Sequence, residues 1–173
     1  MNKLTQSYFC GASDTQIIYR TIGEYFDEIV ERFPNGEALV VRHQPVRWSW
    51  AQLKVEVDRL ATGLLALGVE PGDRVGIWGP NSYEWVLTQI ATAKIGAIMV
   101  CVNPAYRLYE LEYALKKVEC KTIIAAESFK TSDYLGMLNA LAPELAQSEP
   151  GQLQSEKLPY LKTVIRMGDG QSP

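Results

Sequence analysis

The chain has 173 residues, of which 47% are hydrophobic and 21% are charged, and its net charge is −3 at pH 7. This length and composition are typical of one globular domain with a buried core. The 17 basic residues are scattered among 20 acidic ones, whereas a nucleic-acid-binding protein gathers Lys and Arg on one face, so we expect no nucleic-acid partner.

The N-terminal part begins with a helix-forming pattern from Ile22 to Phe33, in which apolar residues recur about every 3.6 positions. Thr21 and Glu24 have the spacing of a capping box, which predicts the start of that helix. Residues 38–41 have the pattern of a strand, and residues 46–48 are predicted to be its hairpin partner.

A second capping box at residues 49–52 begins a helix that we expect to continue to Leu67. The short apolar run 75–78 predicts a strand. We expect Asn81, together with Glu84, to cap the helix that follows this strand.

The apolar stretch 85–102 has nearly the length of a membrane span. It is interrupted by Gln89, Lys94 and Gly96, whereas a spanning helix needs about 20 mostly apolar residues. A buried helix followed by a buried strand explains the stretch better, and we predict no transmembrane segment.

After an Asn-Pro turn, residues 108–118 predict a helix whose acidic start and basic end complement the helix macrodipole. We expect a strand at 122–125, a helix at 132–145 and a last strand at 163–165. The polar, proline-containing segment 147–159 is expected to be a surface loop.

Alternating strands and helices predict an α/β fold with a mostly parallel sheet and helices on both faces. Ligands of such folds bind beyond the carboxyl ends of the strands. In this chain those ends are predicted near residues 79–81, 103–107 and 127–128.

The cysteines are Cys10, Cys101 and Cys120, an odd number without CxxC spacing. They indicate neither a disulfide framework nor a zinc site, and we expect Cys101 to be a buried apolar side chain. Residues 1–19 have neither an apolar signal core nor an Arg-rich amphipathic pattern, so the predicted location is cytoplasmic.

Glycine-rich phosphate-binding motifs of the forms G-x-x-x-x-G-K-[ST] and G-x-G-x-x-G are absent. His43, the only histidine, lies in the predicted hairpin turn, where a surface role is favoured over a catalytic one. For Trp48, Trp50 and Trp85 we favour core packing over a stacking platform for a base.

Arg107 is the most informative basic residue. It follows a strand's carboxyl end and precedes a helix N-terminus, and this combination can bind an anion. From the residues alone we favour the alternative, an exposed arginine that pairs with Glu110 or Glu112.

Several short motifs together resemble one known family, the adenylate-forming (AMP-binding) superfamily, which includes acyl-CoA synthetases, coumarate ligases and luciferases. Within this superfamily the motifs resemble acyl-CoA synthetase family member 2 and its bacterial relatives. The motifs that carry this resemblance are Trp48-Ser49-Trp50-Ala51-Gln52-Leu53, residues 68–75, residues 78–85, Ala93-Lys94-Ile95-Gly96-Ala97, Val102-Asn103-Pro104-Ala105-Tyr106, residues 110–118 and Phe129-Lys130-Thr131.

The resemblance implies the N-terminal subdomain of a fatty acyl-CoA ligase, which uses ATP, CoA and magnesium to activate a fatty acid or other small carboxylate. It divides the chain into an N-terminal extension at 1–18 and a partial α/β subdomain at 19–173. The family's phosphate loop, magnesium ligand and catalytic lysine have no counterpart here. We therefore expect an inactive fragment, the first third of a longer enzyme, that holds no cofactor or metal and has no catalytic residue.

One binding role is carried over to this chain. Some members of the family contact CoA phosphates from basic residues after the Asn-Pro turn, and the resemblance assigns this role to Arg107, although Ala105 occupies the position that is Arg in one relative. The alternatives are another adenylate-forming enzyme, such as a coumarate-type ligase, or a non-catalytic α/β binding or interaction module. Because the missing parts would leave an apolar face uncovered, we also expect self-association.

Overall fold

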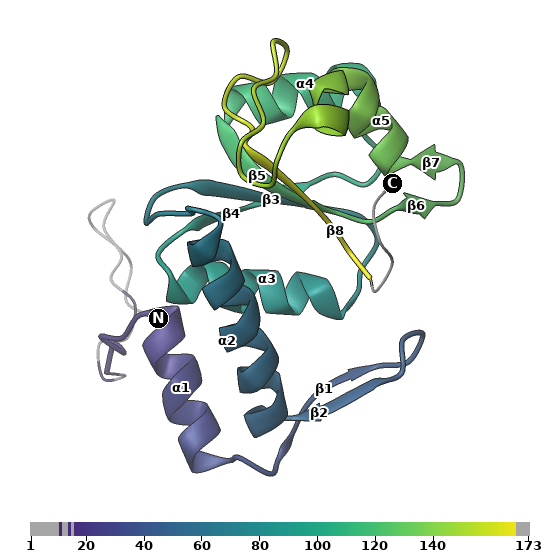
Figure 1. Cartoon of the computed structure of the whole chain (residues 1–173). Helices are drawn as coiled ribbons and strands as arrows, with labels where there is room; N and C mark the ends of the chain where they lie inside the picture. Colours follow the sequence, from purple (N-terminus) through teal and green to yellow (C-terminus); the bar gives the residue numbers. More distant parts are fainter. Residues whose placement is uncertain (1–10, 12–13, 15, 169–173) are drawn as a thin grey trace, which may run out of the picture.

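A four-stranded parallel sheet divides the molecule into two helical layers (Figure 1). The computed structural model describes residues 11, 14 and 16–168, so Cys10 and most of the expected extension lie outside the described residues. The α/β class with helices on both faces of a parallel sheet is confirmed. None of the described helices is long and apolar enough to cross a membrane.

The sheet has the strand order β4-β3-β5-β8, and every neighbouring pair is parallel. Ile77 and Trp78 of the inner strand β3 point to opposite faces of the sheet and are both fully buried, as a strand covered on both faces requires. Cys101 is exposed, so its expected burial is wrong; it belongs to β4, which among the described residues is an edge strand that pairs with β3. The strands are β3 (Arg74–Trp78), β4 (Ile98–Val102), β5 (Cys120–Ala125) and β8 (Thr163–Arg166).

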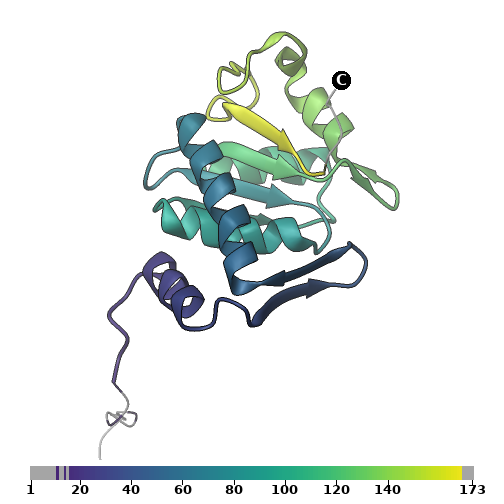
Figure 2. The ribbon, with the colours of Figure 1, turned by 60° about the horizontal axis from the view of Figure 1, so that its bottom comes forward.

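Helices α2 and α3 cover one face of the sheet and α1 packs against these two helices; Figure 2 shows α2 crossing in front of the strands. The capping boxes predicted at Thr21 and Ser49 are both confirmed. The helices bury a shared apolar cluster that includes Phe26, Leu53 and Ala91. Their bounds are α1 (Ile22–Arg32), α2 (Trp50–Ala66) and α3 (Tyr83–Lys94).

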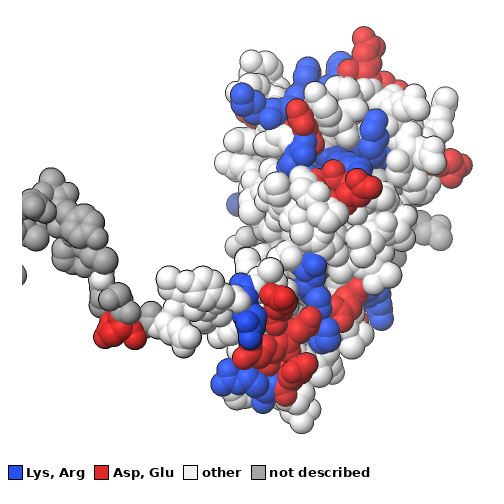
Figure 3. Space-filling view, turned by 90° about the vertical axis from the view of Figure 1, so that its left-hand side faces the viewer, with Lys and Arg blue, Asp and Glu red and all other residues white. Residues whose placement is uncertain are grey.

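A four-membered charge cluster ties these three helices together. The Nζ atoms of Lys54 and Lys94 each lie within 2.8 Å of a carboxylate oxygen of both Asp27 and Asp58. Burial would raise the pKa values of the two aspartates, but the hydrogen bonds from both lysines outweigh it and lower them. Figure 3 shows acidic and basic side chains interspersed over the face of the molecule that includes α1.

The predicted hairpin is confirmed as β1 (Glu37–Val41) paired antiparallel with β2 (Val46–Ser49). Its turn supplies Gln44, whose Oε1 accepts a hydrogen bond from the Tyr83 N–H at 2.9 Å and whose Nε2 donates to Glu84 at 3.1 Å. The predicted cap at Asn81 is wrong, because α3 begins after Ser82 and takes its cap from this distant turn. Gln44 and Tyr83 are 39 residues apart in the chain, so no local sequence pattern could predict this cap.

The other face of the sheet is covered by α4 (Leu108–Lys117), α5 (Tyr134–Leu141) and a 3₁₀ turn, η1 (Pro143–Gln147). The helix expected at 132–145 is therefore shorter than predicted. Its first two residues belong to the small hairpin of β6 (Ser128–Phe129) and β7 (Ser132–Asp133). Pro143 has no N–H to continue α5.

The segment 147–159 contains the end of η1 and is otherwise irregular, but it is more than the surface loop that its composition predicts. Leu153, Ser155 and Leu158 are buried. The two leucines pack in the same apolar cluster as Leu111 of α4 and Leu138 of α5. The segment is therefore part of the core, although its mostly polar composition predicts a surface loop.

We expect the Gln44→Ala variant to lower the free energy of unfolding by about 1–2 kcal/mol, because the Tyr83 N–H and the Glu84 carboxylate both lose a partner. Urea unfolding followed by circular dichroism measures the change. Gln89→Ala, which replaces an exposed glutamine of α3, is the matched control. Equal stability of the two variants would contradict the capping role.

Candidate functional site

The carboxyl ends of β3, β4 and β5 meet at one edge of the sheet, and the loops that leave them diverge. The loop after β3 leads to α3 on one face, whereas the loops after β4 and β5 lead to α4 and α5 on the other (Figure 1). A Cβ atom on Gly79 would lie 2.8 Å from the Cβ of Ala126, so the two loops start in close contact. Such a divergence at the carboxyl edge is where α/β folds bind ligands.

The Asn-Pro loop after β4 is held by its own turn and by two buried aromatic side chains. Asn103 Oδ1 accepts a hydrogen bond from the Ala105 N–H at 2.9 Å, which closes an Asx turn. Trp78 Nε1 donates to the Asn103 carbonyl at 3.0 Å, and the Tyr134 hydroxyl donates to the Pro104 carbonyl at 3.1 Å. The loop is therefore fixed from both β3 and α5.

The two aromatic residues also pack on each other. Trp78 and Tyr134 are both 0% exposed, and their ring centroids lie 4.4 Å apart. Burial raises the pKa of Tyr134, although a hydrogen bond with Ser132 and the nearby charge of Arg107 oppose the shift. The hydroxyl thus stays a neutral donor at physiological pH.

Arg107 precedes α4, at the edge where the expected anion site should lie. Its backbone N–H donates to Glu110 Oε2 at 3.2 Å, whereas its guanidinium donates to Ser132 Oγ at 3.0 Å and to Thr131 Oγ1 at 3.4 Å. The favoured pairing of this side chain with Glu110 or Glu112 is wrong: no ion pair involves Arg107 in the described part of the chain, and Glu112 pairs with Lys116.

The small β6–β7 hairpin positions the Arg107 side chain through the hydroxyls of Thr131 and Ser132. Ser132 is buried, whereas Arg107 itself is exposed. A guanidinium has five N–H donors, and the two hydroxyls accept from only two of its nitrogens. Arg107 can therefore stay in place and still meet an anion from solvent. Sequence reasoning missed Thr131 and Ser132, which carried no signal beyond the Phe-Lys-Thr motif.

The remaining candidates lie away from this edge. His43 is exposed in the β1–β2 turn, as predicted. Trp48 packs at 5.2 Å against Tyr83, and Trp50 packs at 6.2 Å against Phe26, which supports their interpretation as core residues. Within the described residues, no group of three or more His, Cys, Asp or Glu side chains is placed to hold a metal ion.

Comparison with known proteins identifies relatives over most of the chain. The family model described as "AMP-binding enzyme" matches residues 26–169. The protein named medium-chain acyl-CoA ligase ACSF2, mitochondrial, from Rattus norvegicus is 54% identical over 159 residues, which cover 92% of this chain and 26% of that protein. The human protein of the same name is 50% identical with the same coverage. The chain thus spans about a quarter of the length of these relatives.

Solved structures agree with the sequence matches. A putative long-chain-fatty-acid CoA ligase from Rhodopseudomonas palustris superposes with a TM-score of 0.71 at 27% identity, over 89% of this chain and 34% of that one. A fatty acyl CoA synthetase from Mycobacterium tuberculosis superposes with a TM-score of 0.68 at 26% identity, over 84% of this chain and 26% of that one. The predicted fold family is thereby confirmed.

The hydrogen bond from Tyr134 predicts a dependence of stability on alkaline pH. Burial raises the pKa of Tyr134 in the folded state. The hydrogen bond therefore stabilises the protein fully while the pH is below the pKa of tyrosine in the unfolded chain, about 10, and this stabilisation is lost as the pH rises through the pKa of the folded state. At pH 8 we expect Tyr134→Phe to lower the free energy of unfolding by about 1 kcal/mol relative to the unchanged chain. In urea titrations this gap between the two proteins should narrow above pH 10. Tyr160→Phe, at an exposed site outside α4, is the control; a constant gap for Tyr134→Phe would contradict the assignment.

Proposed function

The chain belongs to the AMP-binding enzyme family, and on that premise we propose that it forms the N-terminal part of an AMP-forming acyl-CoA ligase. The observation that carries the proposal is the identity of about half of the aligned residues with proteins named medium-chain acyl-CoA ligases. We assign residues 1–18 to an N-terminal extension and residues 19–173 to a partial α/β subdomain.

The proposed reaction of the longer enzyme has two steps. A fatty acid carboxylate attacks the α-phosphate of ATP to form an acyl-adenylate and pyrophosphate, and the thiol of CoA then displaces AMP to form the thioester. Magnesium would accompany ATP, but no acidic cluster among the described residues fits a metal ion. We propose that this chain contributes the carboxyl edge of the sheet and Arg107.

The location of that enzyme has two candidates. The predicted cytoplasmic location stays a prediction. The name of the rat relative places that protein in mitochondria. Fractionation of cells that express the complete reading frame, followed by immunoblotting, would decide between the two compartments.

The ligase proposal predicts activity for the complete open reading frame that contains these residues. With octanoate, ATP, magnesium and CoA it should form octanoyl-CoA and AMP, as measured by liquid chromatography, and p-coumarate should be a poor substrate. The 173-residue chain alone should show no ATP–pyrophosphate exchange. A preference of the complete protein for p-coumarate would favour the coumarate-type alternative. ATP–pyrophosphate exchange by the 173-residue chain would contradict the fragment assignment. Inactivity of the complete protein would favour a non-catalytic binding module.

The role proposed for Arg107 is a contact with a CoA phosphate. In the complete enzyme, we expect Arg107→Ala to raise the KM for CoA about tenfold, equivalent to about 1.4 kcal/mol, with a smaller effect on kcat and on the KM for ATP. Arg59→Ala, at an exposed arginine of α2, is the matched control. An unchanged KM for CoA in Arg107→Ala would remove the assignment without affecting the ligase proposal.

A further inference from the structure

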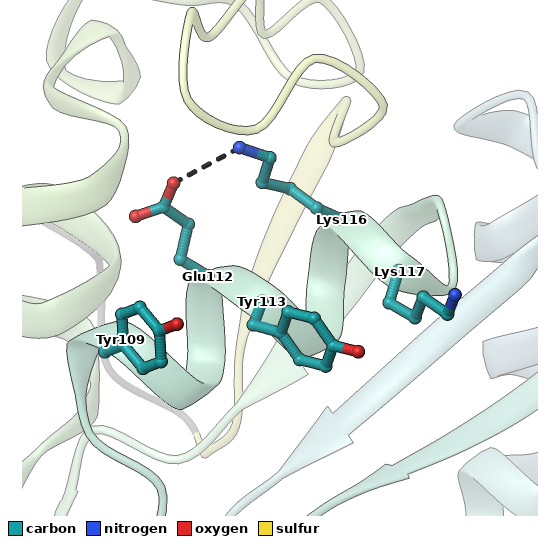
Figure 4. Close-up of a pocket in the computed structure, with 5 residues that line it drawn as sticks. All are labelled: Tyr109, Glu112, Tyr113, Lys116 and Lys117. Carbon is teal, nitrogen blue, oxygen red and sulfur yellow. Dashed lines mark hydrogen bonds and ion pairs between the residues drawn. The ribbon is translucent and has the colours of Figure 1, made fainter.

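The outer face of α4 presents two tyrosines to solvent. Tyr109 is 80% exposed and Tyr113 is 61% exposed. They are four residues apart and therefore lie on one side of the helix, as Figure 4 shows. Opposite them, Leu111 and Leu115 are buried against the rest of the protein. The helix is thus anchored by one side and offers a second, aromatic side outward.

Charged side chains flank the tyrosines in a regular order. At 100° per residue, Glu112 and Lys116 lie along one flank and Glu110 and Lys117 along the other. Glu112 and Lys116 form an ion pair at 3.3 Å. On each flank the acidic residue is nearer the start of the helix and the basic residue nearer its end.

Two hollows run beside the tyrosines. One, of about 410 Å³, is lined by Tyr109, Glu112, Tyr113, Lys116 and Lys117. The other, of about 320 Å³, is lined by the same tyrosines together with Tyr106 and Glu110. Each hollow can receive a side chain from a facing helix.

We propose that this face, defined by Tyr109, Glu110, Glu112, Tyr113, Lys116 and Lys117, binds the same face of a second copy of the chain with the two α4 helices antiparallel. A two-fold axis near Tyr113 places each Glu112 against the partner copy's Lys116 position and each Glu110 against its Lys117 position. One two-fold axis serves both flanks, because the midpoint between Glu112 and Lys116 and the midpoint between Glu110 and Lys117 lie at nearly the same height along the helix. A parallel arrangement would instead bring like charges together.

The expected dimer is weak. A helix of 10 residues is about 15 Å long, so the contact is smaller than the roughly 800 Å² per partner that is typical of a stable complex. The tyrosines supply most of the apolar contact, and tyrosine is enriched at binding hot spots. Exposed ion pairs add little energy but select the antiparallel register. The proposal does not depend on the ligase function.

Sedimentation equilibrium of the 173-residue chain over micromolar to millimolar concentrations tests the proposal. We expect a reversible monomer–dimer equilibrium that Tyr113→Asp abolishes, because two carboxylates would meet at the two-fold axis. Tyr19→Asp is the control, since Tyr19 is also a strongly exposed tyrosine but lies before α1. Thermal unfolding should be unchanged in both variants. A monomer at all concentrations, or a dimer sensitive to Tyr19→Asp and not to Tyr113→Asp, would overturn the proposal.

Exchange of charges tests the antiparallel register. Glu112→Lys and Lys116→Glu should each weaken the homodimer about tenfold, because each variant faces itself with two like-charge contacts. A mixture of the two variants should recover the affinity, since both contacts between unlike copies are then attractive. Failure of the mixture to associate more tightly than either variant alone would exclude the proposed pairing.

Discussion

Two buried hydrogen-bond donors, the Trp78 indole and the Tyr134 hydroxyl, hold the carbonyl oxygens of Asn103 and Pro104, and the arrangement of the carboxyl edge of the sheet depends on them. The Asn-Pro loop supplies the acceptors for these two buried donors, so the packed Trp78–Tyr134 pair and the position of the loop stabilise each other. That loop leads directly into α4. The position of Arg107 is thus set by the packing of β3 against α5.

The two helical layers are stabilised in different ways. The layer of α1, α2 and α3 combines an apolar cluster with the charge cluster around Lys94, whose stem also packs against Gly23. The layer of α4 and α5 rests on an apolar core that includes irregular chain, with Leu153 and Leu158 in it. This second layer carries both proposed contacts: Arg107, the proposed CoA contact, precedes the N-terminus of α4, and the proposed dimer surface lies along the outer face of that helix. Ligand binding at Arg107 therefore need not compete with self-association through Tyr113.

The local signals in the chain predicted much of this structure. Both confirmed capping boxes lie within four residues, and the 3.6-residue apolar period located α1 and α2. The predictions that were wrong involve distant partners. Gln44 caps α3 from another element, and Cys101 is exposed because its strand lies at the sheet edge. Arg107 was correctly predicted to lie after the carboxyl end of a strand, but its hydroxyl partners belong to a hairpin that the sequence pattern did not predict.

The sequence by itself determined the α/β class, most helix and strand positions, and the family, because these depend on periodicity, capping residues and short motifs that neighbouring residues supply. Only the tertiary structure decided the strand order, the cap of α3, the partners of Arg107 and the exposure of the α4 tyrosines. These features depend on contacts between residues far apart in the chain. Such contacts form when side chains bury apolar surface and satisfy polar groups together, and a linear pattern does not contain the geometry of that packing.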